Sequence, residues 1–181
     1  IKLDAEGFHW AQFAFQFAHE VGHVLSGFAD YPNPNLWFEE TMSEAASLFA
    51  LGAMAKAWEK SPPYPNWKGY SASLLKYRDE RLAPSKLPEG TSLVDWFHEH
   101  EGSLRKDPRQ RRLNLLLASQ LFPLFEEDPG RWDALGTLNA VHGDSSRTFA
   151  QYLRDWSRSA AEKHRPFIRA LADRLGVVIA P

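Results

Sequence analysis

The sequence predicts a mainly α-helical fold organised as a single domain over residues 1–181. Apolar residues recur at spacings of three and four between Trp10 and Phe28, which is the period of one helix face. Most later segments carry helix start and stop signals, and few alternate in polarity as strands do. Hydrophobic residues make up 44% and aromatic residues 13% of the 181 residues, so a disordered chain is excluded.

Two long helices are predicted within residues 1–60. Residues 1–3 alternate in polarity, and we expect them to be at most a short remnant of a sheet. The first helix is ended by Gly27 and by the prolines at positions 32 and 34. The second is rich in Ala, Leu and Met, spans about residues 37–58, and is stopped by a proline pair that begins at Pro62.

Residues 61–181 form the predicted helical subdomain. Capping residues and a proline at the first helical position mark where its helices begin, as at Thr91 and at the Asp107-Pro108 pair. The expected helices are residues 71–82, a segment after Thr91 that holds Leu93, Trp96 and Phe97, and residues 113–125, 129–141, 145–160 and 166–175.

The composition excludes several classes of function. The chain has no Cys, which excludes disulfides, thiolate metal sites and a cysteine nucleophile. Its formal net charge is −2, whereas a nucleic-acid binder is usually basic, so we expect no nucleic-acid partner. No stretch reaches the roughly 18 apolar residues of a membrane span, so none is expected.

The residues that point to chemistry are His19-Glu20-Val21-Gly22-His23, inside the first predicted helix. Residues four apart lie on the same helix face, so both imidazoles can reach one metal ion. Glu20 points elsewhere around the helix and can contact a metal-bound water without occupying a coordination position. The surrounding helix is mostly apolar, and burying two histidines and a glutamate there is costly unless they have partners. These features favour a zinc site over two ordinary surface histidines.

A zinc hydrolase usually has three protein ligands and one open position. Glu40 and Glu44 lie four residues apart at the start of the second helix, so both can face the first helix. We predict Glu40 as the third ligand and Glu44 as the acceptor of a hydrogen bond from the far nitrogen of a ligand histidine. Glu44 and Glu39 remain alternative ligands, and Glu39 can instead stabilise the positive start of the helix.

His19-Glu-x-x-His23, followed by Glu40 and Glu44, resembles the gluzincin branch of the zinc metallopeptidases, to which thermolysin-like enzymes and the large zinc aminopeptidases belong. The resemblance covers about residues 9–50. It implies a zincin-like catalytic domain with a helical C-terminal part. The resemblance also implies a fragment, whose missing sheet strands would precede its first residue. Glu39 stands where the family has Asn, and Glu44 stands where thermolysin-like enzymes have Asp.

The reaction of such an enzyme needs a hydrogen-bond donor for the developing oxyanion, usually a Tyr or His. His142 lies in a short stretch that resembles the one supplying a His in thermolysin-like enzymes, and we take it as the candidate. Tyr70 and Tyr77 are rivals by analogy with the aminopeptidases, and the choice stays open.

The sequence therefore predicts a zinc-dependent hydrolase, specifically a metallopeptidase acting on a peptide or protein substrate. His19, His23 and Glu40 would hold one Zn²⁺, and Glu20 would act as general base toward the metal-activated water. The alternative is a non-catalytic binding module with a structural or degenerate metal site.

Overall fold

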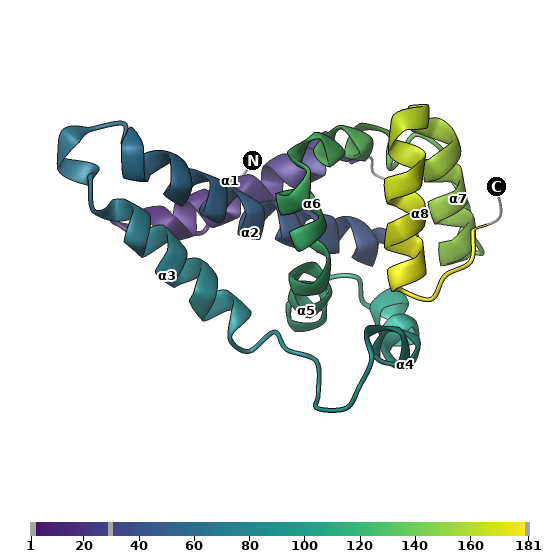
Figure 1. Cartoon of the computed structure of the whole chain (residues 1–181). Helices are drawn as coiled ribbons and strands as arrows, with labels where there is room; N and C mark the ends of the chain where they lie inside the picture. The colour runs from purple at the N-terminus through teal and green to yellow at the C-terminus, as the bar shows by residue number, and fades with distance from the viewer. Residues whose placement is uncertain (1–2, 29–30, 180–181) are drawn as a thin grey trace.

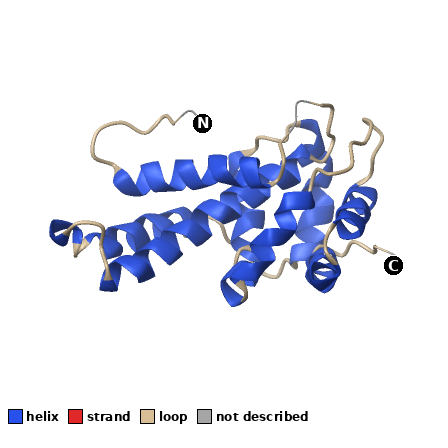
Figure 2. Cartoon of the chain, turned by 90° about the horizontal axis from the view of Figure 1, so that it is seen from above, coloured by secondary structure: helices blue, strands red, loops and turns tan. Residues whose placement is uncertain are grey.

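The computed structural model describes residues 3–28 and 31–179, and its regular structure within these ranges is entirely helical (Figure 2). The mainly α-helical prediction is confirmed. The proposed strand remnant at residues 1–3 falls largely outside the described residues, and Leu3 belongs to a loop. The α-helices are α1 (Trp10–Leu25), α2 (Leu36–Lys60), α3 (Tyr70–Leu82), α4 (Leu93–Lys106), α5 (Arg111–Leu121), α6 (Pro123–Glu127), α7 (Phe149–Ser159) and α8 (Arg165–Arg174). Short 3-10 helices span Pro65–Trp67, Pro129–Thr137 and Glu162–His164.

Two predicted helices differ in kind from those observed. The segment predicted as one helix over residues 113–125 is divided into α5 and α6, because Pro123 lacks the N–H that would continue the first helix and suits the first position of the second. The helix predicted over residues 129–141 is a 3-10 helix that ends at Thr137.

The helix predicted over residues 145–160 begins four residues late, at Phe149. Its start is fixed by a capping box in which the Thr148 hydroxyl accepts a hydrogen bond from the Gln151 backbone N–H at 3.2 Å. In return, the Gln151 side chain accepts one from the Thr148 N–H at 2.8 Å. The hydrogen bonds of the cap, rather than the apolar pattern, therefore decide where α7 begins.

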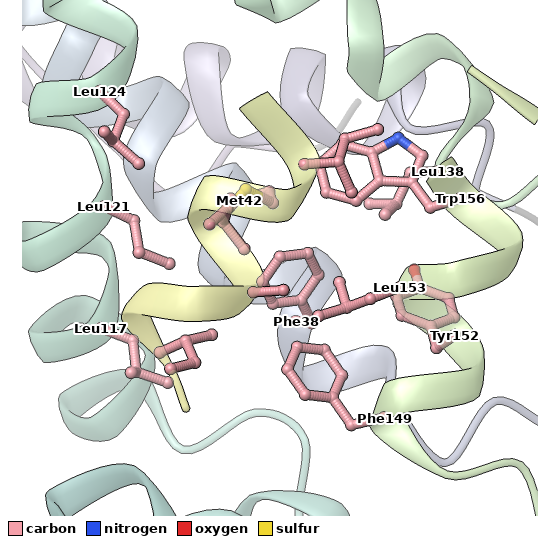
Figure 3. Packing of buried hydrophobic residues seen from close by; sticks show 14 of the residues in the cluster. Phe38, Met42, Leu117, Leu121, Leu124, Leu138, Phe149, Tyr152, Leu153 and Trp156 are labelled. Carbon is pink, nitrogen blue, oxygen red and sulfur yellow. The ribbon is translucent and has the colours of Figure 1, made fainter. Parts of the chain in front are cut away.

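The central element is α2, which packs against α1, α3 and α5 (Figure 1). Within it, residues 37–48 are buried except for Glu40. Two apolar clusters meet on this helix. Figure 3 shows one of them, in which Phe38 and Met42 lie between leucines of α5 and α6 on one side and Leu153 and Trp156 of α7 on the other. The second cluster joins α2 to α1, α3 and α5. None of the described helices is long and apolar enough to cross a membrane.

Helices α1 and α2 approach closely where the histidine motif faces the acidic start of α2. A Cβ atom placed on Gly22 would lie only 2.8 Å from the Ser43 Cα, so glycine is needed for this contact. One turn further along, the Ser47 hydroxyl donates a hydrogen bond to the Phe15 carbonyl at 2.8 Å. The close approach brings side chains from α1 and α2 within reach of a single ion.

Candidate metal centre

The three residues predicted as metal ligands bring one side-chain nitrogen or oxygen atom each into a close cluster. His19 Nε2 and His23 Nε2 lie 3.2 Å apart. The Glu40 Oε2 atom lies 3.4 Å from His19 Nε2 and 3.6 Å from His23 Nε2. Two ligand atoms about 2.0–2.1 Å from a zinc ion, at a tetrahedral angle, are about 3.3 Å apart. The three observed separations therefore match the edges of a zinc coordination tetrahedron, and these residues fit the ion.

The side chains of this triad are largely but not fully covered. The exposed fractions are 20% for His19, 18% for His23 and 12% for Glu40. All three line a cleft of about 510 Å³, so a fourth coordination position would face the cleft rather than the core. A structural zinc site normally closes all four positions with protein ligands, whereas a catalytic site leaves one open.

Carboxylates lie behind both histidine rings. The His23 Nδ1 atom is 2.7 Å from Glu39 Oε1, a hydrogen-bond distance. The His19 Nδ1 atom is 3.9 Å from Glu44 Oε1, which is ion-pair range but longer than a hydrogen bond. Each carboxylate favours the proton on Nδ1 and leaves Nε2 free to bind a metal. Glu44 thus lies beside a candidate ligand histidine but not within the predicted hydrogen-bond distance, and it is Glu39 that makes such a contact, with His23.

Glu39 is held from its far side as well. It is 1% exposed, and its Oε2 atom accepts a hydrogen bond from Asn139 Nδ2 at 2.6 Å. Asn139 Oδ1 in turn accepts one from the Tyr152 hydroxyl at 2.8 Å. Burial raises the pKa of Tyr152 well above its usual value, so its hydroxyl stays protonated and donates. No local pattern in the sequence predicts this series of hydrogen bonds, because Asn139 lies 100 residues from Glu39.

The charges of the triad attract a positive charge to its centre. Burial alone lowers the pKa of His23, but the carboxylates of Glu39 and Glu40 outweigh it and raise the pKa to about 9. Burial alone raises the pKa of Glu40, but hydrogen bonds from His19 and His23 outweigh it and hold that pKa well below its usual range. Burial raises the pKa of Glu44. The electrostatics that favour a proton on His23 would equally favour a divalent cation between the rings.

Glu20 also lines the cleft, one residue after the first ligand histidine. No hydrogen bond or ion pair joins its carboxylate to any of the described residues. Glu20 thus lies beside, but not among, the three residues of the triad.

The three candidates for oxyanion donor are not in the same place. His142 is exposed, stacks on Tyr31 with ring centroids 4.3 Å apart, and is not among the residues that line the cleft. Tyr70 also lies outside the cleft lining, and its hydroxyl accepts a hydrogen bond from the Ala11 N–H at 3.0 Å. Tyr77, on α3, does line the cleft. The geometry brings only Tyr77 to the cleft that holds the triad.

Comparisons of the chain with protein-family models, with curated proteins and with solved structures found no match.

Proposed function

We propose that this protein is a zinc-dependent hydrolase, specifically a metallopeptidase. The observation that carries the proposal is the triad of His19, His23 and Glu40, whose ligand atoms are 3.2, 3.4 and 3.6 Å apart at the wall of a cleft. Two imidazole nitrogens and one carboxylate oxygen suit Zn²⁺, and a His₂Glu set with an open position is a known catalytic ligand set.

A bound Zn²⁺ would lower the pKa of a coordinated water toward 7 and polarise the carbonyl of the scissile bond. The Glu20 carboxylate would accept the proton of the attacking water and later deliver it to the nitrogen of the leaving amine. Glu39, and more loosely Glu44, would hold the two imidazole rings with Nε2 toward the ion. Tyr77 is the candidate to donate a hydrogen bond to the developing oxyanion.

The test measures hydrolysis of a mixed peptide library by zinc-loaded protein, with and without a chelator. We expect cleavage that disappears with the chelator and returns with zinc. Glu20→Gln should keep the bound zinc but lower the rate by about 10²- to 10⁴-fold, the usual contribution of a general base. Glu99→Gln, at an exposed position outside the cleft lining, is the matched control and should cleave normally.

One result would reject the mechanism, and another would reject the function. Unchanged cleavage by the Glu20→Gln protein would remove Glu20 from the reaction. Tight zinc binding without hydrolysis of any peptide would point instead to a non-catalytic metal-binding module.

A further inference from the structure

The cleft that holds the triad has an uneven distribution of charge. Its acidic side chains come from α1, α2 and the residues before α1. Its basic side chains come from other segments. They are Arg81 of α3, Arg111 of α5, and Arg109 just before α5. The wall formed by α3 and α5 is therefore cationic.

Arg81 is the most enclosed of these arginines. It is partly buried, and its guanidinium carbon lies 5.1 Å from the centre of the Phe15 ring, an arrangement that orients the group. Its Nε atom is buried and has no hydrogen-bond partner, and none of the described residues forms an ion pair with it. A partly desolvated guanidinium without a carboxylate partner is costly, and an anionic ligand would offset that cost.

Arg111 is exposed at the first turn of α5, and it too forms no ion pair with the described residues. Arg109 differs, because its Nε donates to Glu40 Oε1 at 3.4 Å and is thereby engaged with the triad. Both Arg81 and Arg111 line the same cleft as His19 and Glu44. They are the two unpaired cations of the cleft.

Resting on the proposed function, we propose that the cleft selects peptides carrying a carboxylate close to the scissile bond, and that Arg81 and Arg111 bind it. The planar guanidinium fork matches a carboxylate with two parallel hydrogen bonds. The carboxylate has two possible sources, the free C-terminus of the peptide or an Asp or Glu side chain. In both cases it lies against Arg81 of α3 and Arg111 of α5, in the cleft that His19 and His23 also line.

Equilibrium binding tests this inference without turnover. Zinc-loaded Glu20→Gln protein is titrated against dye-labelled heptapeptides and followed by fluorescence anisotropy. The peptides form matched pairs, with a free or an amidated C-terminus, and with Asp or Asn at each central position. We expect the carboxylate form of at least one pair to bind about tenfold or more tightly, the effect of one charge-assisted hydrogen bond. The pair that shows the preference identifies the source of the carboxylate.

Arginine variants in the same background locate the site. Arg111→Gln should reduce the preference to about twofold or less, and Arg81→Gln should do the same where it remains folded by circular dichroism. Arg81→Lys keeps the charge but loses the fork, so part of the preference should remain. Arg112→Gln, next in the chain and outside the cleft lining, is the control and should bind like its parent.

The inference is overturned if every pair binds within a factor of two, if no peptide binds, or if Arg112→Gln removes the preference as fully as Arg111→Gln. Its failure can be told apart from failure of the proposed function. Wild-type protein that cleaves neutral, amidated peptides as well as acidic ones is a peptidase without this selectivity. Protein that shows the arginine-dependent preference but cleaves nothing has the carboxylate site without peptidase activity.

Discussion

Replacing Glu39 by glutamine should weaken zinc binding about ten- to a hundredfold, the range expected when a side chain that holds a metal ligand is changed. Glu39 does not reach the triad centre with its own oxygens. It acts through His23, whose Nδ1 atom lies 2.7 Å from Glu39 Oε1. The glutamine has nearly the same shape but no charge, so the substitution tests the hydrogen bond rather than the packing.

The magnitude follows from the two partners of Glu39. Its Oε1 faces the His23 Nδ1–H, and its Oε2 accepts from Asn139 Nδ2 at 2.6 Å. With Asn139 kept in its present orientation by the Tyr152 hydroxyl, a glutamine, which has one oxygen and one NH₂ group, leaves either His23 or Asn139 facing a donor instead of an acceptor. A buried donor without an acceptor costs about 1–3 kcal/mol. When the lost hydrogen bond is the one that holds His23 in its metal-binding orientation, this cost corresponds to roughly a tenfold to hundredfold change in the Kd for zinc.

The assay is competition for zinc against a chelating dye at neutral pH, with circular dichroism to confirm the fold. Glu44→Gln is the informative comparison, because Glu44 Oε1 lies 3.9 Å from His19 Nδ1 and its loss should cost less than the loss of Glu39. Glu40→Gln should cost the most, since it removes a ligand. The exposed Glu99→Gln should bind zinc like the wild type.

A folded Glu39→Gln protein that binds zinc within a factor of two of the wild type would refute the reasoning. So would a Glu44→Gln protein that loses more affinity than Glu40→Gln, because that order would make Glu44 the ligand and Glu40 the support.

Three further outcomes are expected. Gly22→Ala should lower stability by about 1–3 kcal/mol in thermal unfolding, because its Cβ would meet the Ser43 backbone. Gly102→Ala, where an added Cβ would have nothing within 4 Å, should instead raise stability by about 0.5–1 kcal/mol. Equal changes in the two variants would contradict the close contact at Gly22. Phe38→Ala, at a fully buried core position, should cost about 3–5 kcal/mol in urea unfolding, and a cost under 1 kcal/mol would place Phe38 outside the core. The pKa of His23 is raised from 6.5 to about 9, so in chelator-treated protein the contribution of His23 to stability is complete below pH 6.5 and lost as the pH rises toward 9. A His23→Gln protein that loses the same amount of stability over this pH range would contradict this assignment.

Local signals in the sequence were enough to predict most of the fold. Helices α1, α2, α3 and α8 follow from apolar periodicity and from proline and glycine stops, and their ends differ by a few residues from those expected. The apolar pattern did not predict the break within residues 113–125 or the start of the helix within residues 145–160. Pro123 sets the break between α5 and α6, and the Thr148 cap sets the first residue of α7.

The site was predictable where its residues are close in the chain. The spacing of His19 and His23 fixes their common face, and the spacing of Glu40 and Glu44 does the same on the next helix. From the sequence, Glu39 could be interpreted only as a ligand or as an acid at the start of a helix. Its role in holding His23 was not predictable, because its other partner, Asn139, comes from a loop 100 residues away.

The cationic wall of the cleft could not be predicted from the sequence for the same reason. Arg81 and Arg111 come from different helices and share no spacing rule. They line one cleft because α3 and α5 both pack against α2 and also contact each other. No local pattern separates Arg111, which lines the cleft, from its neighbour Arg112, which does not.

The energetics of burial explain why α2 would keep three glutamates beside two histidines. Glu39 and Glu44 are 1% and 4% exposed, and Glu40 is only 12% exposed at its side chain. Burying carboxylates that lack a compensating charge costs several kcal/mol each. One proton on His23 and the Arg109 guanidinium, 3.4 Å from Glu40, compensate at most two of them, and burial raises the pKa of Glu44 against the opposing charges of His19, Arg81 and Arg111. A divalent ion at the triad supplies two positive charges at the point where ligand atoms from α1 and α2 converge. Zinc should therefore stabilise the contact between these helices, in addition to its proposed role in hydrolysis.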